Sequence, residues 1–331
     1  MSRNLVQLRK NRGDLGVLDT ALQRLKHVMH ERRVITPADV AEVARASGQP
    51  EAAVWGVATY YGDLGTERRG RARVKVCKGA ACHAACADAS VGWMEEALGL
   101  KEGQTSADGS VSLETVYCLG FCNAGPAVEI EGRIYGELTA EKARRLATDL
   151  GASELPEAHD ALVPAFAVHD GPAIVLERLA SPIDATDLAR ARSHGAFTGL
   201  AKAISELTPE QVLAEIDLSQ LRGRGGAGYS TAQKWRFTAA NARTTGEAYV
   251  VCNADEGDPG SYIDKYLMER DPFAVIEGLA IAGYAIGAAR GVVYVRSEYP
   301  RSAPTLRRAA IAARAAGLLG RSVLGSGFAF E

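Results

Sequence analysis

Cys77-Lys78-Gly79-Ala80-Ala81-Cys82 and, thirty-five residues later, Cys118-Leu119-Gly120-Phe121-Cys122 indicate the fold of the first half of this 331-residue chain. Each pair follows a segment that reads as a strand, Val74–Val76 before Cys77 and 111–117 before Cys118. Thiolates at the ends of neighbouring strands can surround a two-iron cluster. A structural zinc site is the alternative, although zinc pairs usually have a tighter spacing. The spacing therefore favours iron–sulfur over zinc.

The residues around the two pairs predict the rest of a small domain. Glu131-Gly132 separates two short strands as a hairpin turn would, and Asp108-Gly109 marks a polar turn. The expected elements are a helix over 87–98, strands over 128–130 and 133–135, and a helix over 140–150. This order predicts a thioredoxin-like sandwich.

The residues before the first pair predict helices. Apolar residues recur at three- and four-residue spacing between Leu18 and Met29. Thr36-Pro37 is typical of a helix start, with threonine as the N-cap and proline in the first helical position. A third helix is expected around Trp55, so the chain should begin with a small helical subdomain.

The second half carries a different signal, Gly223-Arg224-Gly225-Gly226-Ala227-Gly228. Glycines let the backbone approach phosphate oxygens, and amides at a helix start favour an anion. The acidic segment Asn253–Gly260 follows an expected strand, 248–252, where α/β proteins place ligand-binding loops. Taken alone, the glycine run fits a tight structural turn equally well, and the acidic run fits a solvated turn.

Strands and helices alternate from residue 196 onward, which predicts a mostly parallel sheet. Two buried strands are expected, 248–252 and 291–296, with helices over 197–206, 272–286 and 305–316. The fold class is therefore α/β, with an N-terminal helical subdomain, a thioredoxin-like [2Fe-2S] domain and a partial Rossmann-like flavin- or nucleotide-binding domain. The expected boundaries are 1–70, 71–152, a proline-bearing linker or arm over 153–195, and 196–331.

Composition sets the class of protein. The formal net charge is −2, so no global field favours nucleic acid or an anionic membrane. Six cysteines, four of them in two close pairs, fit a reducing cytosol and metal binding better than disulfides. The sequence begins without an apolar signal region, and its longest apolar stretch, 273–289, is too short and mixed to cross a bilayer. A cytoplasmic location is expected. Cys86 and Cys252 are interpreted as buried core residues.

Residues 15–150 resemble the two-iron ferredoxin-like subunit of the respiratory complex I peripheral arm. The resemblance rests on 55–61 (WGVATYY), the cysteine spacing, Gly125-Pro126 and 135–139 (YGELT). It implies a [2Fe-2S] cluster held by Cys77, Cys82, Cys118 and Cys122.

Residues 196–331 resemble the NADH-binding flavoprotein subunit of complex I and its relatives. The resemblance rests on 224–228 (RGGAG), Lys234-Trp235, 253–256 (NADE), Asp271-Pro272 and 283–287 (GYAIG). It implies FMN and NAD(H) as cofactors. The residues implied to line the FMN are Gly223, Arg224, Gly225, Gly226, Lys234, Asn253 and Asp255.

The resemblance also implies residues for the nucleotide. Tyr229 and Phe237 occupy positions where aromatic rings sandwich the adenine, and Glu256 and Asp258 are expected near the nucleotide. No side chain is expected to act as a strong acid or base, because the flavin carries the chemistry. Glu256 and Lys234 are expected to tune the pocket.

One departure from the family bears on specificity. The respiratory enzymes have glutamate where this chain has Asp258. A carboxylate one methylene further from the ribose should repel a 2′-phosphate less, so we expect weaker discrimination against NADP(H). Asp258 and Arg296–Pro300 also resemble NAD-linked formate dehydrogenases and bifurcating hydrogenases.

A fused diaphorase subunit is the function that these resemblances imply, working with a separate formate- or hydrogen-oxidising subunit, with formate slightly preferred. The family continues beyond the position of Glu331 with a [4Fe-4S] module, so the expectation is a fragment or a split protein. The rival interpretation is a non-catalytic iron–sulfur electron-transfer or scaffold subunit that lacks flavin.

Overall fold

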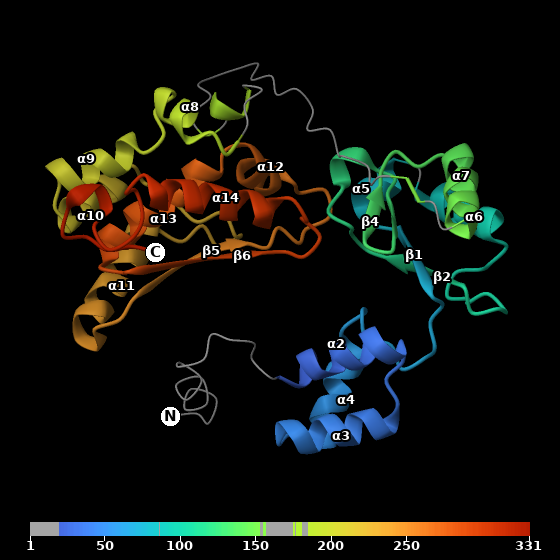
Figure 1. Cartoon of the computed structure of the whole chain (residues 1–331). Coiled ribbons are helices and arrows are strands. Elements are labelled where there is room, and N and C mark those ends of the chain that lie inside the picture. The colour runs from blue at the N-terminus through green and yellow to red at the C-terminus, as the bar shows by residue number, and fades with distance from the viewer. Residues whose placement is uncertain (1–19, 86, 153–154, 157–174, 176, 181–184) are drawn as a thin grey trace. The chain divides into compact units, whose positions relative to one another are not determined.

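The computed structural model describes residues 20–331 except 86, 153–154, 157–174, 176 and 181–184 (Figure 1). The chain divides into two compact units. The N-terminal unit comprises Met1–Tyr117 and Ala124–His159, and the C-terminal unit comprises Cys118–Asn123 and Asp160–Glu331. The segment Cys118–Asn123, called the cysteine loop below, therefore packs with the second half of the chain.

The N-terminal unit begins with three helices, as the sequence predicts: α2 (Ala21–Arg32), α3 (Pro37–Ser47) and α4 (Glu51–Tyr60). Thr36 caps α3 by accepting a hydrogen bond from the amide of Asp39, and Pro37 takes the first helical position. The helices bury a core that includes Leu25, Val40 and Val54.

The same unit contains the expected thioredoxin-like sheet, with strand order β2-β1-β3-β4. Parallel pairing joins β1 to β2, while β1–β3 and β3–β4 are antiparallel. Glu131 and Gly132 both adopt positive φ in the β3–β4 turn, as a tight hairpin requires. The strands are β1 (Ala72–Cys77), β2 (Val111–Val116), β3 (Val128–Ile130) and β4 (Arg133–Tyr135).

Two helices, α6 (Ala87–Leu98) and α7 (Ala140–Gly151), contribute to the core of this sheet, where Val74, Met94 and Leu146 are buried. Both agree with the sequence prediction. Two short elements are absent from that prediction: α5 (Ala80–Ala84), which carries Cys82, and the 3-10 turn η2 (Cys122–Ala124). Each is less than two turns long, so neither leaves a periodic pattern in the sequence.

The C-terminal unit alternates helices with two strands, β5 (Tyr249–Ala254) and β6 (Arg290–Val295), paired in parallel. Phe273, Leu200 and Ala280 are central to its largest core cluster. The helices are α8 (Leu188–Ser193), α9 (Thr198–Glu206), α10 (Pro209–Leu218), α11 (Thr231–Thr245), α12 (Ile263–Arg270), α13 (Pro272–Ile286) and α14 (Ser302–Ala315), with 3-10 turns η3 (Glu177–Ala180) and η4 (Val323–Gly325).

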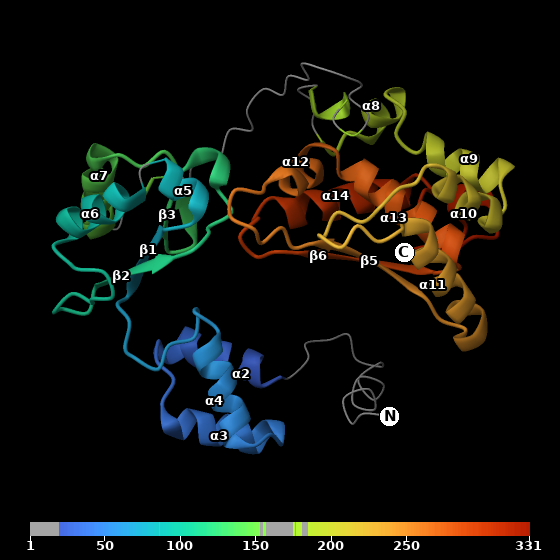
Figure 2. The same cartoon turned by 180° about the vertical axis from the view of Figure 1, so that it is seen from behind.

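The prediction that both strands are buried is wrong for one face of this sheet. Helices α12, α13 and α14 lie on one side of β5 and β6 (Figure 2). On the other face, Tyr249, Val251, Val292 and Tyr294 are between 45% and 63% exposed. Apolar strand sequences indicate burial on both faces, but a two-stranded sheet covered on one side leaves alternate side chains in solvent.

Two other regions refine the sequence expectations. Most of the predicted linker lies outside the described residues, while its described part includes η3 and α8. Residues 325–330 form no regular strand: Phe330 makes an isolated antiparallel bridge with Gly320. The amide of Glu331 donates a hydrogen bond to the carbonyl of Ala289 at 3.0 Å. The carbonyl of Glu331 accepts a hydrogen bond from the amide of Gly291 at 2.8 Å.

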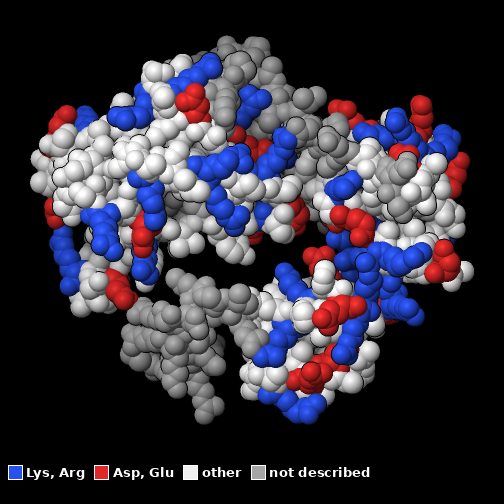
Figure 3. All heavy atoms as spheres, in the orientation of Figure 1, with Lys and Arg blue, Asp and Glu red and all other residues white. Residues whose placement is uncertain are grey.

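Charge is mixed on the visible face of the N-terminal helices, where Lys and Arg alternate with Asp and Glu (Figure 3). This mixture agrees with the net charge of −2 and lacks the single-sign stripe typical of a nucleic-acid surface. Among the described residues, no helix has the length and apolar character that crossing a membrane requires.

Candidate functional site

The first cysteine pair lies in the N-terminal unit. Cys77 is the last residue of β1 and Cys82 lies on α5, and both are buried. The amide of Gly79 donates to the Cys77 sulfur at 3.4 Å. Gly125 lacks the Cβ that would stand 3.2 Å from the Cys82 sulfur. The backbone is therefore shaped to keep space around both sulfurs.

The second pair lies in the cysteine loop of the C-terminal unit. The Cys118 and Cys122 sulfurs are 3.8 Å apart. A tetrahedral metal with bonds to sulfur of about 2.3 Å would hold two sulfurs roughly 3.8 Å apart. The amide of Gly120 donates to the Cys118 sulfur at 3.3 Å, and that of Gly260 donates to the Cys122 sulfur at 3.2 Å. This pair has the spacing and amide donors that one tetrahedral iron needs.

The surroundings of Cys118 favour the thiolate form of its side chain. Its pKa is lowered to about 5, against the opposing effect of burial. The hydrogen bond with Cys122 is the largest cause, followed by the Gly120 amide and the positive charge of Arg296. Because the thiolate is the form that binds metal, Cys118 is prepared for ligation at neutral pH.

The four cysteines are divided between the two units, and within the described residues no three Cys, His, Asp or Glu side chains form a group placed to hold a metal ion. Each pair lies within one unit, and the four-cysteine ligand set remains a prediction. The donor set fits a [2Fe-2S] cluster, since each iron would take two thiolates.

The cysteine loop has partners that the sequence does not reveal. Lys265 and Arg296 approach it from α12 and from the end of β6, and Tyr299 packs against Gly120. In the sequence, Arg296 and Tyr299 enter only through the family resemblance of Arg296–Pro300, and Lys265 carries no motif signal. Only the packing of segments more than a hundred residues apart identifies them.

The glycine loop, Gly223–Gly228, connects α10 to α11. Its base is closed by a hydrogen bond from the Gly223 amide to the Tyr229 carbonyl, 2.8 Å, and by an isolated bridge between Arg222 and Ser230. Gly226 and Gly228 adopt φ of +101° and +59°, which favour glycine. Cβ atoms placed on Gly225 or Gly226 would meet nothing within 4 Å.

Helix α11 begins directly after the loop, with Ser230 as its N-cap. Open backbone at the start of a 15-residue helix fits a phosphate group, because amides and the helix dipole both favour an anion there. The loop thus fits the phosphate of FMN or of a nucleotide. Lys234 lies in the first turn of α11 and is exposed.

The predicted cofactor residues are exposed with one exception. Tyr229 is 50% and Phe237 63% exposed. The other exposed members of the predicted set are Gly223, Arg224, Gly225, Gly226, Lys234, Asn253, Asp255 and Asp258. Asn253 lies near the end of β5, where its side chain accepts a hydrogen bond from the Asp255 amide at 3.1 Å.

Glu256 is the exception, because only 8% of it is exposed. Its carboxylate accepts hydrogen bonds from Ser261 Oγ at 2.9 Å, the amides of Asp264 and Lys265 at 3.1 and 3.2 Å, and Tyr299 OH at 2.9 Å. Four donors satisfy a carboxylate, so Glu256 holds the start of α12 and the segment after β6 together.

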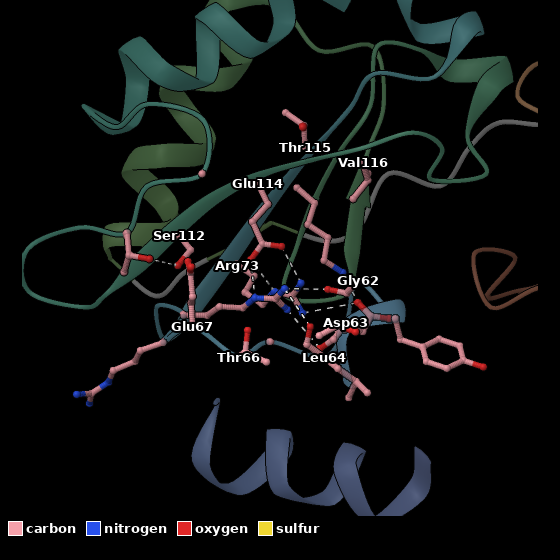
Figure 4. A pocket seen from close by; sticks show the side chains of 18 of the residues that line it. Gly62, Asp63, Leu64, Thr66, Glu67, Arg73, Ser112, Glu114, Thr115 and Val116 are labelled. Carbon is pink, nitrogen blue, oxygen red and sulfur yellow. Dashed lines mark hydrogen bonds and ion pairs between the residues drawn. The ribbon is translucent and has the colours of Figure 1, made fainter. Parts of the chain in front are cut away.

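A cavity of about 700 Å³ lies elsewhere, in the N-terminal unit, between the loop after α4 and strands β1 and β2 (Figure 4). Arg73 donates to Glu114 through two nitrogens at 3.1 and 2.7 Å, and Lys75 pairs with Asp63 at 3.1 Å. None of the predicted cofactor or metal residues lines it. Its paired charges hold the loop that follows α4.

Of the two remaining cysteines, Cys252 and Cys86, the structure describes only the first. Cys252 is partly buried on β5, and burial raises the pKa of its thiol, in agreement with a core role. Cys86 lies outside the described residues.

Two family models match the chain. Residues 16–151 match the thioredoxin-like [2Fe-2S] ferredoxin family, and residues 216–326 match the Nuo51 FMN-binding domain. The chain therefore joins a thioredoxin-like [2Fe-2S] domain to an FMN-binding domain, as the sequence resemblances imply.

Several curated proteins are similar in sequence to this chain. The chain is 35% identical over 241 residues to the alpha subunit of the NAD-reducing hydrogenase HoxS of Cupriavidus necator, covering 72% of this chain and 39% of the relative. It is 45% identical over 137 residues to one subunit of the NADH-quinone oxidoreductase of Aquifex aeolicus, covering 41% and 31%. It is 48% identical over 135 residues to the HndC subunit of the NADP-reducing hydrogenase of Solidesulfovibrio fructosivorans, covering 41% and 27%.

A solved structure extends the likeness over most of the chain. An NAD⁺-reducing [NiFe]-hydrogenase in the H₂-reduced state matches with a TM-score of 0.67 and 27% identity, covering 90% of this chain and 50% of that one. The chain spans less than half the length of these curated relatives and half of the solved chain.

Proposed function

We propose that this fusion of a [2Fe-2S] domain with an FMN-binding domain is a diaphorase subunit, which transfers electrons between NAD(H) and iron–sulfur clusters through FMN. The observation that carries the proposal is the open glycine loop, Gly223–Gly228, at the start of α11 in a chain with two cysteine pairs. Relatives named as subunits of NAD-reducing hydrogenase and NADH-quinone oxidoreductase support it.

In this proposal the chain's own residues bind and orient the cofactors. The backbone of Gly223–Gly226 and the first turn of α11 hold the FMN phosphate, with Arg224 and Lys234 supplying positive charge. Asn253 and Asp255 contact the flavin from the end of β5. Bound FMN would supply the chemistry that accepts a hydride and donates single electrons. Cys77, Cys82, Cys118 and Cys122 would hold the iron–sulfur cluster that serves as the electron acceptor.

Tyr229 and Phe237 stack on the adenine of the nucleotide. Both rings are at least half exposed, which leaves their faces open to a planar base. Glu256 supports this site indirectly. With its carboxylate already engaged by four donors, it fixes the segment that carries Asp258 instead of contacting the nucleotide.

Asp258 sets the choice between NAD(H) and NADP(H) in this proposal. It is exposed, and its shorter side chain leaves more room near the ribose than glutamate would. The relative named as an NADP-reducing hydrogenase subunit supports acceptance of NADP(H). We expect Asp258→Glu to raise the ratio of kcat/KM for NADH over NADPH. Equal ratios for the two proteins, or no NADPH turnover by the unchanged chain, would contradict this role.

The partner is a subunit of a multi-subunit redox complex in the cytoplasm. Two relatives are named as hydrogenase subunits, which supports a hydrogen-oxidising partner. A formate-oxidising partner, preferred from Asp258 and Arg296–Pro300 in the sequence, has no such support among these relatives. Pull-down of the native complex followed by assay with hydrogen and with formate separates the two.

The test of the proposed function is anaerobic reconstitution of the full chain with FMN. We expect stoichiometric flavin, and bleaching of its absorbance near 450 nm when NADH is added. Lys234→Met should weaken FMN binding without loss of the iron–sulfur signal. A chain with an intact cluster that neither retains FMN nor responds to NADH would support the scaffold interpretation instead.

A further inference from the structure

The cysteine loop is held from several sides by the C-terminal unit. The amide of Gly260 donates to the Cys122 sulfur at 3.2 Å. Gly120 lies so close to Tyr299 that an added Cβ would stand 2.9 Å from its ring and 2.7 Å from the carbonyl of Glu298. These close contacts fix the position of the cysteine loop within this unit.

Two positive side chains are part of that packing. Lys265 is 3% exposed, donates to the carbonyl of Gly120 at 3.3 Å, and lies 4.1 Å from the centre of the Phe121 ring. Arg296 is 8% exposed, and its guanidinium is 3.9 Å from the Cys118 sulfur. Burying a cation is unfavourable unless it has partners, and the cysteine loop supplies partners to both.

The placement of these cations is fixed by the ends of the two strands. Arg296 follows the last residue of β6 and donates to the carbonyl of Glu256 at 2.5 Å. The Glu256 carboxylate binds the amide of Lys265 and the hydroxyl of Tyr299, which ties α12 to the segment after β6. Glu298 pairs with Arg296 at 3.3 Å, and Glu269 attracts Lys265, so the positive charge is partly offset.

We propose that Arg296 and Lys265 are positioning residues for the iron–sulfur cluster, which hold the cysteine loop and raise the reduction potential of the cluster. Reduction adds one electron and thus one negative charge at the cluster. Nearby positive charge in a water-poor environment stabilises the reduced form more than the oxidised form. The same strand ends that carry the proposed flavin and nucleotide residues therefore set how readily the cluster accepts an electron. This inference rests on the proposed function only for the presence of the cluster.

The test is an EPR-monitored redox titration of the full chain with dithionite, without NADH. Arg296→Gln and Lys265→Met should each shift the midpoint potential of the cluster to a lower value. Arg296→Lys keeps the charge and should stay close to the unchanged chain. The matched control is Arg290→Gln, which removes the same charge from the opposite end of β6, where the side chain is 56% exposed. It should leave the potential unchanged.

Iron content and EPR g-values, measured on the same samples, decide the remaining outcomes. An unshifted potential in Arg296→Gln and Lys265→Met at full iron content would overturn the inference. If Arg296→Gln loses the cluster, Arg296→Lys must restore it, and failure to do so would overturn the role of charge. No cluster signal in the unchanged chain would overturn the proposed function itself, and this inference with it.

Discussion

The cysteine loop and the glycine loop are both short glycine-containing connections, yet the first is packed against the rest of the C-terminal unit and the second is open to solvent. The cysteine loop is packed, with Gly120 against Tyr299 and Lys265 bonded to its backbone. The glycine loop is closed only at its base, and its tip faces solvent. A resident metal group needs ligands that are already in place, whereas a site for an exchanging nucleotide needs open backbone. Of these two loops, the one that carries predicted metal ligands is therefore the more closely packed.

The strongest test of this comparison removes one of the predicted cysteine ligands. We expect Cys122→Ala to abolish the [2Fe-2S] EPR signal and to reduce iron content to background, because a cluster cannot keep an iron with one thiolate missing. Cys252→Ala, a partly buried cysteine outside both pairs, is the control and should keep the full signal. Two irons per chain in Cys122→Ala would show that another residue serves as the ligand.

A pair of glycine substitutions sharpens the comparison next. Gly120→Ala places a Cβ within 3 Å of Tyr299 and Glu298 at a φ of +73°, and should lower the free energy of unfolding by about 3 kcal/mol. Gly225→Ala meets no atom within 4 Å and should be within about 0.5 kcal/mol of the unchanged chain. Urea unfolding followed by circular dichroism compares them. Equal midpoints would mean that the cysteine loop is not packed as described.

Two tyrosines provide a smaller contrast. Tyr299→Phe removes one of the four donors to the buried Glu256 carboxylate and should cost about 2 kcal/mol of stability. Tyr229→Phe removes a hydroxyl from a half-exposed ring and should cost almost nothing. Thermal unfolding of both variants measures the difference. A larger loss in Tyr229→Phe would reverse the assignment of packed and open loops.

The weakest effect that we expect concerns the open loop and binding. Phe237→Ala should raise the KM for NADH about fivefold, equivalent to about 1 kcal/mol of lost stacking on the adenine. Its ring is 63% exposed, so unfolding should be almost unchanged. Steady-state kinetics with an artificial acceptor gives the KM. The control Phe237→Tyr keeps a ring face and should therefore keep the KM for NADH. An unchanged KM in Phe237→Ala would show that this ring does not bind the nucleotide.

Local elements and the two domains could be predicted from the sequence alone. Helices α6, α7 and α13, the β3–β4 hairpin and the Thr36-Pro37 helix start were accessible because each depends on residues close together in the chain. The cysteine spacing and the glycine run were also visible, since their chemistry depends on residue type at short separation. Matches to a [2Fe-2S] family and an FMN-binding family confirm the two domain types.

Which side chains meet depends on tertiary packing. The sequence predicts Glu256 near the nucleotide, but it does not reveal that Ser261, Asp264, Lys265 and Tyr299 supply four donors to the buried carboxylate. Strands β5 and β6 look buried in sequence, but one face is open because helices cover only the other. Lys265 and Arg296 reach the cysteine loop across more than 140 residues of sequence. Such contacts are set by packing of distant segments, and no local pattern of residue types encodes them.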